Sequence, residues 1–561
     1  MAGPTEPEEC MSQELFERHK ALLEVALAAT ATRGAFNAWP DKPADYNEVL
    51  EAEGKQAFGN YCDSFFYLDQ PGVGERIGRE TSPYGFELGI QYPKTNLATI
   101  MPAAQRAGEA WSRVEADARA GTLLEILHQL NTRSFELAQA TMHTSGLPYE
   151  QAFASGGPHA QERGLEALAL TYNEMKSIPS SSLWEKGEGA QALRVKKTFR
   201  IVGRGVGLVI GCSTLPNWSA YPGLFASLMA GNAVLIKPHP HAVLPLAITV
   251  GVARHVLKEA GYDPNLVMLV VDDEVRPITQ AVATRPEVKI IDYTGNHDFA
   301  AWLTDSAQGK LVYCATAAVN PVVIDGTDDL PGLLQHLVTA VARGAGRSCL
   351  SPRVIFTPAT GVQTPGGGIT TEEFDERLTQ AFQRFTNDTA AACEQMGPLR
   401  PHEFDARIDG AALFGEVVVP SQVLGHPSYP TAYYRSPLVM RVRADHVDAY
   451  MHEWFGPIVF LVECESTAES LTRAAALARE NGAIVASLYS LDAGVCSAAE
   501  ESFGATGTTV CINFRGDALP GASAAFSDFH VSGMNPSGNA TLTDSAFVAG
   551  RFRVVQTKTL L

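Results

Sequence analysis

The sequence has no excess of positive charge, no long apolar run and no cluster of cysteines. Its 43 Lys and Arg residues are outnumbered by 62 Asp and Glu residues, which gives a net charge of −19. Without a basic stripe, we expect neither a nucleic-acid partner nor an anionic-membrane surface. The longest apolar run, residues 242–253, is interrupted by Pro245. It is shorter than the ~20 residues that a membrane span requires.

Signals for targeting and for metal binding are also missing. The first ten residues, MAGPTEPEEC, are acidic and do not show the basic and then apolar order of a signal peptide. The nine cysteines are scattered, and no CxxC or Cys/His spacing suits zinc, so we expect reduced thiols and no metal site. Together these features predict a soluble, cytoplasmic protein.

Short apolar runs alternate with helical segments from residue 200 onward. We predict strands at 200–211, 233–237, 266–271 and 288–294, and helices between them. Repeated strand–helix–strand units predict an α/β fold with a doubly wound parallel sheet, which binds ligands at the carboxyl ends of its strands. A second α/β run follows, and the alternating segment 551–557 predicts a last strand. That strand pairs either with another subunit's sheet or with its own domain.

The glycine-rich sequence does not supply a phosphate-binding loop. Gly203, Gly205 and Gly207 match only part of the GxGxxG pattern, and they lead into a strand rather than a helix. The GxxxxGK[ST] pattern does not occur in the sequence.

Four short motifs occur in a fixed order. They are KPHP (237–240), YTGN (293–296), GRSC (346–349) and EWFGP (453–457). In order and separation they resemble the KPSE, FTGS, GQxC and ExFGP motifs of the aldehyde dehydrogenase superfamily. Other stretches, including GGPHAQERGLEALA (156–169) and AAFSDFHVSGMNP (524–536), resemble the PaaN-like proteins of phenylacetic acid degradation.

This resemblance implies an aldehyde dehydrogenase-like α/β fold, with a Rossmann-like cofactor domain, an α/β catalytic domain and a carboxyl-terminal oligomerisation strand. We therefore divide the chain into an amino-terminal extension (1–90), an NAD(P)-binding domain (91–325), a catalytic domain (326–540) and an oligomerisation segment (541–561). The resemblance also implies a homodimer or a homotetramer.

Cys349 is the nucleophile that the resemblance implies. A thiolate adds to an aldehyde, hydride leaves to a nicotinamide, and a thioester remains on the sulfur. An oxyanion donor is expected before the first helix of the cofactor domain. Counting without a gap places Thr214 at that position, and Asn217 is a second candidate nearby.

The dinucleotide, NAD or NADP, is expected to contact a second group of residues. These are Lys237, His239, Gly295, Asn296, Glu453 and Phe455. Pro240 replaces the family's acidic residue that pairs with the adenosine ribose hydroxyls. A 2′-phosphate would not be repelled there, so both cofactors remain candidates.

Two positions depart from the family pattern. Ala315 stands where the family carries the glutamate that activates water for release of the acyl group. Loss of such a base slows this step by ~10²–10⁴-fold. Arg347 replaces the usual Gln two residues before the nucleophile. It favours the Cys349 thiolate, binds an anionic substrate group or makes a structural ion pair.

These departures leave two hypotheses. In the first, an NAD(P)-dependent oxidoreductase acts on a small aldehyde, aromatic-derived or a CoA-linked semialdehyde, or on an acyl thioester. Its thioester on Cys349 is then released to a thiol such as CoA, or is formed from an acyl thioester and reduced. In the second, a repurposed member of the family uses Cys349 for acyl transfer or hydrolysis, or binds only a nucleotide.

Overall fold

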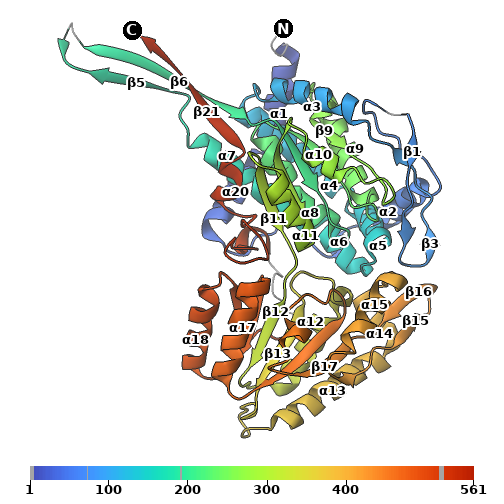
Figure 1. Ribbon diagram of the computed structural model, residues 1–561. Coiled ribbons are helices and arrows are strands. Elements are labelled where there is room, and N and C mark those ends of the chain that lie inside the picture. The colour runs from blue at the N-terminus through green and yellow to red at the C-terminus, as the bar shows by residue number, and fades with distance from the viewer. Residues whose placement is uncertain (1–5, 73, 190–191, 517, 519–523) are drawn as a thin grey trace.

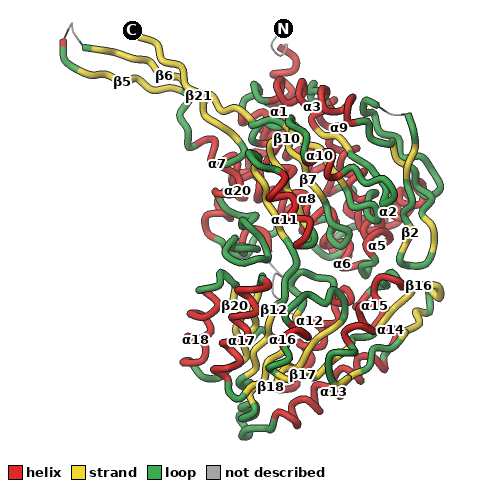
Figure 2. Tube along the Cα trace, viewed as in Figure 1, coloured by secondary structure: helices red, strands yellow, loops and turns green. Residues whose placement is uncertain are grey.

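The computed structural model describes residues 6–72, 74–189, 192–516, 518 and 524–561. Figure 1 shows an upper part built around one parallel sheet and a lower part built around another, with a three-stranded arm projecting from the upper part. Figure 2 shows the same chain with helices covering both sheets. This is the α/β fold that the alternating sequence pattern predicts.

The upper sheet has the strand order β11-β10-β7-β8-β9, and all of its pairs are parallel. Its strands are β7 (Val206–Ile210), β8 (Ala233–Lys237), β9 (Val267–Leu269), β10 (Val288–Thr294) and β11 (Leu311–Ala315). The chain runs outward from β7 through β8 to β9 and then returns to β10 on the other side of β7. The crevice where this order reverses is the place where such sheets bind nucleotides.

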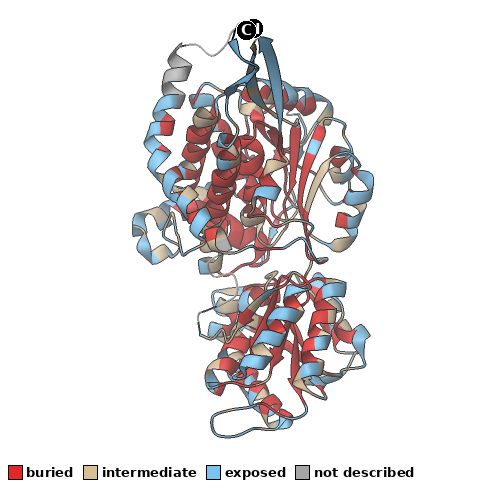
Figure 3. Cartoon of the chain, turned by 90° about the vertical axis from the view of Figure 1, so that its left-hand side faces the viewer, coloured by how far each residue is buried: buried red, intermediate tan, exposed pale blue. Residues whose placement is uncertain are grey.

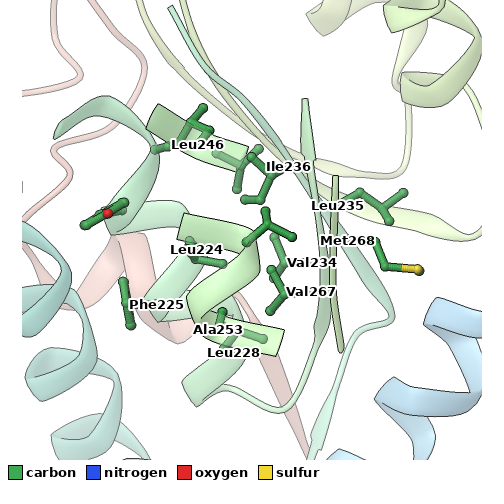
Figure 4. Packing of buried hydrophobic residues seen from close by; sticks show 14 of the residues in the cluster. Leu224, Phe225, Leu228, Val234, Leu235, Ile236, Leu246, Ala253, Val267 and Met268 are labelled. Carbon is green, nitrogen blue, oxygen red and sulfur yellow. The ribbon is translucent and has the colours of Figure 1, made fainter. Parts of the chain in front are cut away.

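Helices connect and cover these strands. They are α8 (Pro216–Met229), α9 (Leu244–Glu259), α10 (Thr279–Ala283) and α11 (His297–Ser306). Figure 4 shows apolar side chains of α8 and α9 packed on β8 and β9, among them Leu224, Leu228, Leu246, Val234 and Val267. All five of these side chains are almost fully buried, which stabilises the sheet from this face.

The amino-terminal residues join this same core. They form α1 (Glu6–Thr32), α2 (Glu48–Tyr61) and four short strands, β1 (Arg76–Ile77), β2 (Thr81–Ser82), β3 (Phe86–Glu87) and β4 (Tyr92–Pro93). Next come α3 (Leu97–Trp111), α4 (Ala116–Asn131), α5 (Ser134–Ser145), α6 (Tyr149–Gly156) and α7 (Pro158–Lys176). Phe16 and Leu23 of α1 belong to the apolar cluster that contains the upper sheet. The described residues of the predicted extension 1–90 therefore pack as part of the upper part.

The lower sheet has the order β14-β17-β18-β13-β12-β19-β20, and within it β14 is antiparallel. Its strands are β12 (Asn320–Ile324), β13 (Pro352–Pro358), β14 (Glu416–Val419), β17 (Leu438–Arg443), β18 (Ile458–Cys464), β19 (Val485–Tyr489) and β20 (Thr509–Ile512); β15 (Val423–His426) and β16 (Tyr429–Arg435) form a separate hairpin. Its helices are α12 (Leu330–Ala342), α13 (Thr371–Asn387), α14 (Thr389–Met396), α15 (Pro401–Ala411), α16 (Val447–Tyr450), α17 (Thr467–Asn481) and α18 (Ala493–Gly504).

The prediction of a single strand at 200–211 was wrong. The structure has two strands in different sheets, β6 (Leu193–Gly203) in the arm and β7 in the upper sheet. Between them Gly205 has a φ of +145°, and a Cβ there would lie 2.8 Å from the Lys289 side chain. The Asn232 side chain accepts the backbone N–H groups of Arg204 and Gly205, which the sheets do not pair.

The arm consists of β5 (Ser181–Lys186), β6 and β21 (Phe552–Leu560), in the order β21-β6-β5. The last strand, β21, thus pairs with β6 of its own chain, in register from Phe552 opposite Gly203 to Leu560 opposite Val195. Figure 3 shows that the arm is exposed over most of its length.

The segment that precedes β21 returns from the lower sheet to the upper part. It contains α19 (Ala524–Ser527) and α20 (Ser545–Ala549), and Phe526 is buried in the cluster of the upper sheet. The strands of the lower sheet thus lie between residues 320 and 512, whereas part of the segment after them, still within the predicted catalytic domain 326–540, packs on the upper part. None of the described helices combines the length and apolar character needed to cross a bilayer.

Arg551 fastens this returning segment to the upper sheet. Its guanidinium donates to both carboxylate oxygens of Asp292 in β10, at 2.8 and 2.5 Å, and to Ser227 Oγ at 2.7 Å. The Arg551 side chain is completely buried.

We expect Arg551→Met to lower the free energy of unfolding by about 3–5 kcal/mol, because it leaves the Asp292 carboxylate buried without its cation. Chemical denaturation measures this loss. The matched double variant Arg551→Met/Asp292→Leu should recover much of it. Equal stability of the single variant and the unsubstituted protein would contradict the role of this ion pair.

Candidate active site

A cavity of about 740 Å³ lies at the carboxyl ends of the upper strands and is closed by loops of the lower part. Its walls include Ile210 at the end of β7, Lys237 at the end of β8, Thr294 at the end of β10 and Ala315 at the end of β11. This volume is within the range of small-molecule and cofactor sites.

The structure brings all but one of the predicted site residues to this cavity. Its lining includes Thr214, Lys237, His239, Gly295, Asn296, Cys349, Glu453 and Phe455. Asn217 is absent from the described lining residues. It is fully buried in the first turn of α8, where its Nδ2 donates to the Gly156 carbonyl at 3.0 Å, so its amide holds α8 against α6.

Lys237 is buried rather than solvated. Its Nζ lies 2.6 Å from Asp272 Oδ1 and donates to the Pro238 carbonyl at 2.7 Å. Burial lowers the pKa of Lys237, and the Asp272 carboxylate partly opposes this shift. An ammonium group has three N–H donors, and these two partners leave one for a ligand in the cavity.

Gly295 and Asn296 form a tight turn between β10 and α11. A Cβ at Gly295 would lie 2.2 Å from the Tyr293 hydroxyl, so this position requires glycine. The Asn296 side chain accepts the Phe299 N–H at 2.8 Å and caps α11. The turn therefore directs the amino terminus of a helix toward the cavity wall, an arrangement that favours anions.

The GRSC and EWFGP motifs touch one another. A Cβ at Gly346 would lie only 2.3 Å from the Gly456 carbonyl oxygen, so the two loops can approach this closely only with glycine at 346. Arg353 strengthens the junction, since it donates to the Gly456 carbonyl at 2.8 Å and lies 3.6 Å from Glu453. Glu453 and Cys349 are thereby held on the same wall.

The backbone before the nucleophile is unusual. Gly344, Ala345 and Gly346 have φ values of 59°, 54° and 65°, and for the buried Ala345 the left-handed conformation carries strain. Arg347 holds this loop, because it donates to the carbonyls of Gly344, Ser145 and Gly146. Of the three roles left open for Arg347, the structure supports a structural one, made through backbone carbonyls rather than an ion pair.

Asn320, which the sequence analysis did not single out, fixes the other side of the Cys349 loop. Its Nδ2 donates to the carbonyls of Cys349 and Ser351 at 2.7 and 3.1 Å. Its Oδ1 accepts the N–H groups of Ile484 and Val485, where β19 begins. The signal was present, because Asn320 stands five residues after Ala315, the position compared with the family's glutamate.

Cys349 is half-buried, and its sulfur contacts a histidine. The Nε2 atom of His530 lies 4.0 Å from Cys349 Sγ. Burial raises the pKa of the Cys349 thiol to about 12, and Cys212 and Glu453 add to this rise. Arg163 lowers this pKa slightly, so Arg163 rather than Arg347 is the cation that favours the thiolate.

The expected place of the general base holds no acid. Ala315 lines the cavity, and among the described lining residues the carboxylates are Glu403 and Glu453. Thr214 is also on the wall, and its hydroxyl lies 3.5 Å from Cys212 Sγ. Trp218 lines the cavity too. Tyr221, in contrast, is fully buried, and its hydroxyl forms a hydrogen bond with the Thr249 hydroxyl in the core.

Comparison with known proteins identifies the family. The sequence profile described as the aldehyde dehydrogenase family matches residues 91–541. The chain belongs to the aldehyde dehydrogenase family. The crystal structure of an NAD-dependent aldehyde dehydrogenase from Burkholderia multivorans is 43% identical and has a TM-score of 0.95, covering 98% of this chain and 99% of that one.

More distant aldehyde dehydrogenases share the fold or part of the sequence. The 1-pyrroline-5-carboxylate dehydrogenase of Thermus thermophilus has a TM-score of 0.72 at 17% identity, covering 94% of this chain and 99% of that one. An N-succinylglutamate 5-semialdehyde dehydrogenase from Paraburkholderia xenovorans is 26% identical over 51% of this chain and 54% of its own length. A protein of the same name from Burkholderia lata is 25% identical over 55% of this chain and 60% of its own length. The chain thus spans little more than half the length of these curated relatives.

The raised pKa of Cys349 predicts slow alkylation at neutral pH. Because the thiolate is the more reactive form, the rate of Cys349 modification by iodoacetamide should rise by about tenfold or more in total between pH 7 and 10, and should still be rising at pH 10. Mass spectrometry of the Cys349 peptide measures this rate, and Cys496 of the same protein is the internal reference. A rate that is already constant above pH 7 would show that the thiol is ionised in the resting protein.

Proposed function

We propose that this protein is an NAD(P)-dependent oxidoreductase that oxidises an aldehyde through a thioester on Cys349. One observation carries the proposal: Cys349 and the predicted dinucleotide-binding residues line the same cavity. Cysteine suits this role because its sulfur is both a good nucleophile and a good leaving group.

The residues at the upper edge of the cavity fit a nicotinamide dinucleotide. The remaining N–H of Lys237 suits a ribose hydroxyl, and the amino terminus of α11 suits the pyrophosphate. Glu453 and Phe455 lie on the opposite wall, where they would hold the nicotinamide half beside Cys349. When it is bound, the dinucleotide supplies the hydride acceptor. With Pro240 in place of the family's acid, NADP and NAD are both candidates.

The apolar part of the cavity lining supports an apolar substrate. Trp218, Leu215, Ile484 and Leu542 line the cavity together with the nucleophile. Such a wall suits the aromatic-derived aldehyde that the PaaN-like sequence stretches imply. The curated relatives act on semialdehydes by name, so a semialdehyde, including one linked to CoA, is the second substrate candidate.

Two acceptors remain for the acyl group. Because Ala315 provides no carboxylate, transfer to the thiol of CoA is one candidate, and the reverse reduction of an acyl thioester follows the same path. Hydrolysis by water is the other. The alternative function is that of a repurposed family member. Such a protein would use Cys349 for acyl transfer or hydrolysis, or would bind only a nucleotide, and it would transfer no hydride.

A homo-oligomer is also proposed, with the arm as its contact. Register places Trp184, Val195 and Leu560 in one row across the three strands, and Val554 and Ile201 face the same way. Trp184, Val554 and Leu560 are exposed. An apolar face of this kind on a projecting sheet suits a second copy of the chain, as a dimer or a tetramer.

The central test measures reduced nicotinamide. We expect turnover with apolar aldehydes and NAD or NADP, loss of turnover in Cys349→Ala, and an acyl adduct on Cys349 by mass spectrometry. Parallel reactions with and without CoA identify the acceptor. Silence with every aldehyde and both cofactors, while either dinucleotide still binds, would contradict the redox function and favour the repurposed alternative.

Introducing charged residues on the apolar face of the arm tests the proposed contact between copies of the chain. We expect Trp184→Glu/Leu560→Glu to convert an oligomer to a monomer in sedimentation velocity, since burying two carboxylates in an apolar contact is costly. Thr557→Glu, on the opposite face of β21, is the matched control and should stay oligomeric. An unchanged sedimentation coefficient in the double variant would exclude this face as the contact.

A further inference from the structure

A histidine lies beside the reacting sulfur, and the function proposed above does not use it. His530 Nε2 is 4.0 Å from Cys349 Sγ, at the limit of a hydrogen bond to sulfur, and His530 lines the same cavity. His530 is buried, with 7% of its surface exposed. It comes from the segment that returns from the lower sheet to the upper part, so its position is fixed by tertiary packing rather than by a motif next to Cys349.

Packing holds the imidazole in this place. The Trp218 ring meets the His530 ring edge to face, with centroids 4.8 Å apart. The Arg163 guanidinium lies 4.8 Å from the Trp218 ring centroid and pairs with Glu166 at 3.2 Å. The next residue in the chain, Val531, packs with Ala318 and Ile484 in an apolar cluster that Cys349 also contacts. The histidine is therefore preorganised against the nucleophile from two sides.

Acidic residues on and beside the cavity wall already pair with cationic side chains. Glu453 lies 3.6 Å from the Arg353 guanidinium, and Asp272 pairs with Lys237. Position 315, where the family carries its base, is an alanine on the cavity wall. The His530 side chain, in contrast, places Nε2 within 4.0 Å of Cys349 Sγ.

We propose that His530 is the catalytic acid–base residue of this site, and that it does the work for which Ala315 has no side chain. The inference rests on the proposed aldehyde dehydrogenase function. It goes beyond that function by naming the group that handles the protons.

The protons and bonds balance as follows. As the Cys349 Sγ–C bond forms, the S–H proton passes through Nε2 to the aldehyde oxygen. Loss of hydride to the dinucleotide, and of the hydroxyl proton to solvent, leaves the thioester. When water attacks, its proton moves to Nε2 as the O–C bond forms, the C–S bond breaks, and Nε2 returns the proton to Sγ. A thiol acceptor gives up its S–H proton in the same way.

The electrostatics agree with a neutral resting pair. Burial, together with the nearby Arg163 cation, lowers the pKa of His530 to about 3. Since the Cys349 pKa is raised, the resting state is a thiol beside a neutral imidazole whose lone pair is available near pH 7. The proton therefore moves together with bond formation, rather than before it as in a preformed ion pair.

The first experiment uses His530→Phe, which keeps an aromatic ring against Trp218 but has no base. We expect turnover to fall ~10²–10⁴-fold and acyl-enzyme to accumulate on Cys349. The exposed His255→Asn is the matched histidine control and should keep full activity. Equal melting temperatures establish that the variants are folded. Turnover of His530→Phe within threefold of the unsubstituted protein would overturn the proposal.

Two rescues separate chemistry from packing. Ala315→Glu, introduced into His530→Phe, restores the family's carboxylate and should recover turnover with water as acceptor. Free imidazole should likewise restore turnover to His530→Ala. Full turnover of His530→Phe with CoA but not with water would show that a thiol acceptor needs no base, and would overturn the shared role. Failure of both rescues in folded variants would make His530 a packing residue and overturn the proposal.

A further readout does not depend on turnover. Alkylation of Cys349 by iodoacetamide at pH 8 should slow several-fold in His530→Phe, because the imidazole no longer accepts the thiol proton. If the unsubstituted protein oxidises no aldehyde, the proposed function fails, whereas this measurement still tests the contact between His530 and Cys349. An unchanged alkylation rate would then overturn the role of His530.

Discussion

The site depends on one buried amide. Asn320 uses both ends of its side chain, with Nδ2 on the loop of Cys349 and Oδ1 on the start of β19. Four backbone groups that no strand pairs are satisfied at once, which a shorter or apolar side chain could not do. The Cys349 loop is therefore held by the same side chain that completes the start of β19 in the lower sheet.

Whether a feature depends on local or on distant residues explains which features the sequence predicted. Strands β8 and β10 and the motifs beside Lys237, Gly295 and Cys349 are local patterns, and most of them fell where the pattern placed them. Period and spacing within a short window carry that information. The break between β6 and β7 was missed because it depends on Lys289 and Asn232, which are remote in the sequence.

Contacts between distant segments account for the other differences. Asn217 has the right residue type near the right position, but the contact with Gly156 turns its amide into the core. Arg347 was open to three roles, and the carbonyls of Ser145 and Gly146, about 200 residues away, decide between them. His530 belongs to a stretch that the resemblance included, yet no local pattern reports that it meets a sulfur 181 residues earlier. Residue composition and hydrophobic periodicity indicate which face of a helix or strand is buried, but they do not indicate which other element packs against that face.

The crossing between the two sheets has a consequence for how the molecule is divided. The chain leaves the upper part at Ala315 and returns beside it at Gly538, where the two residues form an antiparallel bridge, and Thr316 N donates to the Ser537 carbonyl at 2.8 Å. The lower sheet is thus an insert whose entrance and exit are neighbours. Excision of the insert at this neck would keep the upper part covalently continuous while removing Cys349, so the two walls of the cavity are separable in the gene although they meet in space.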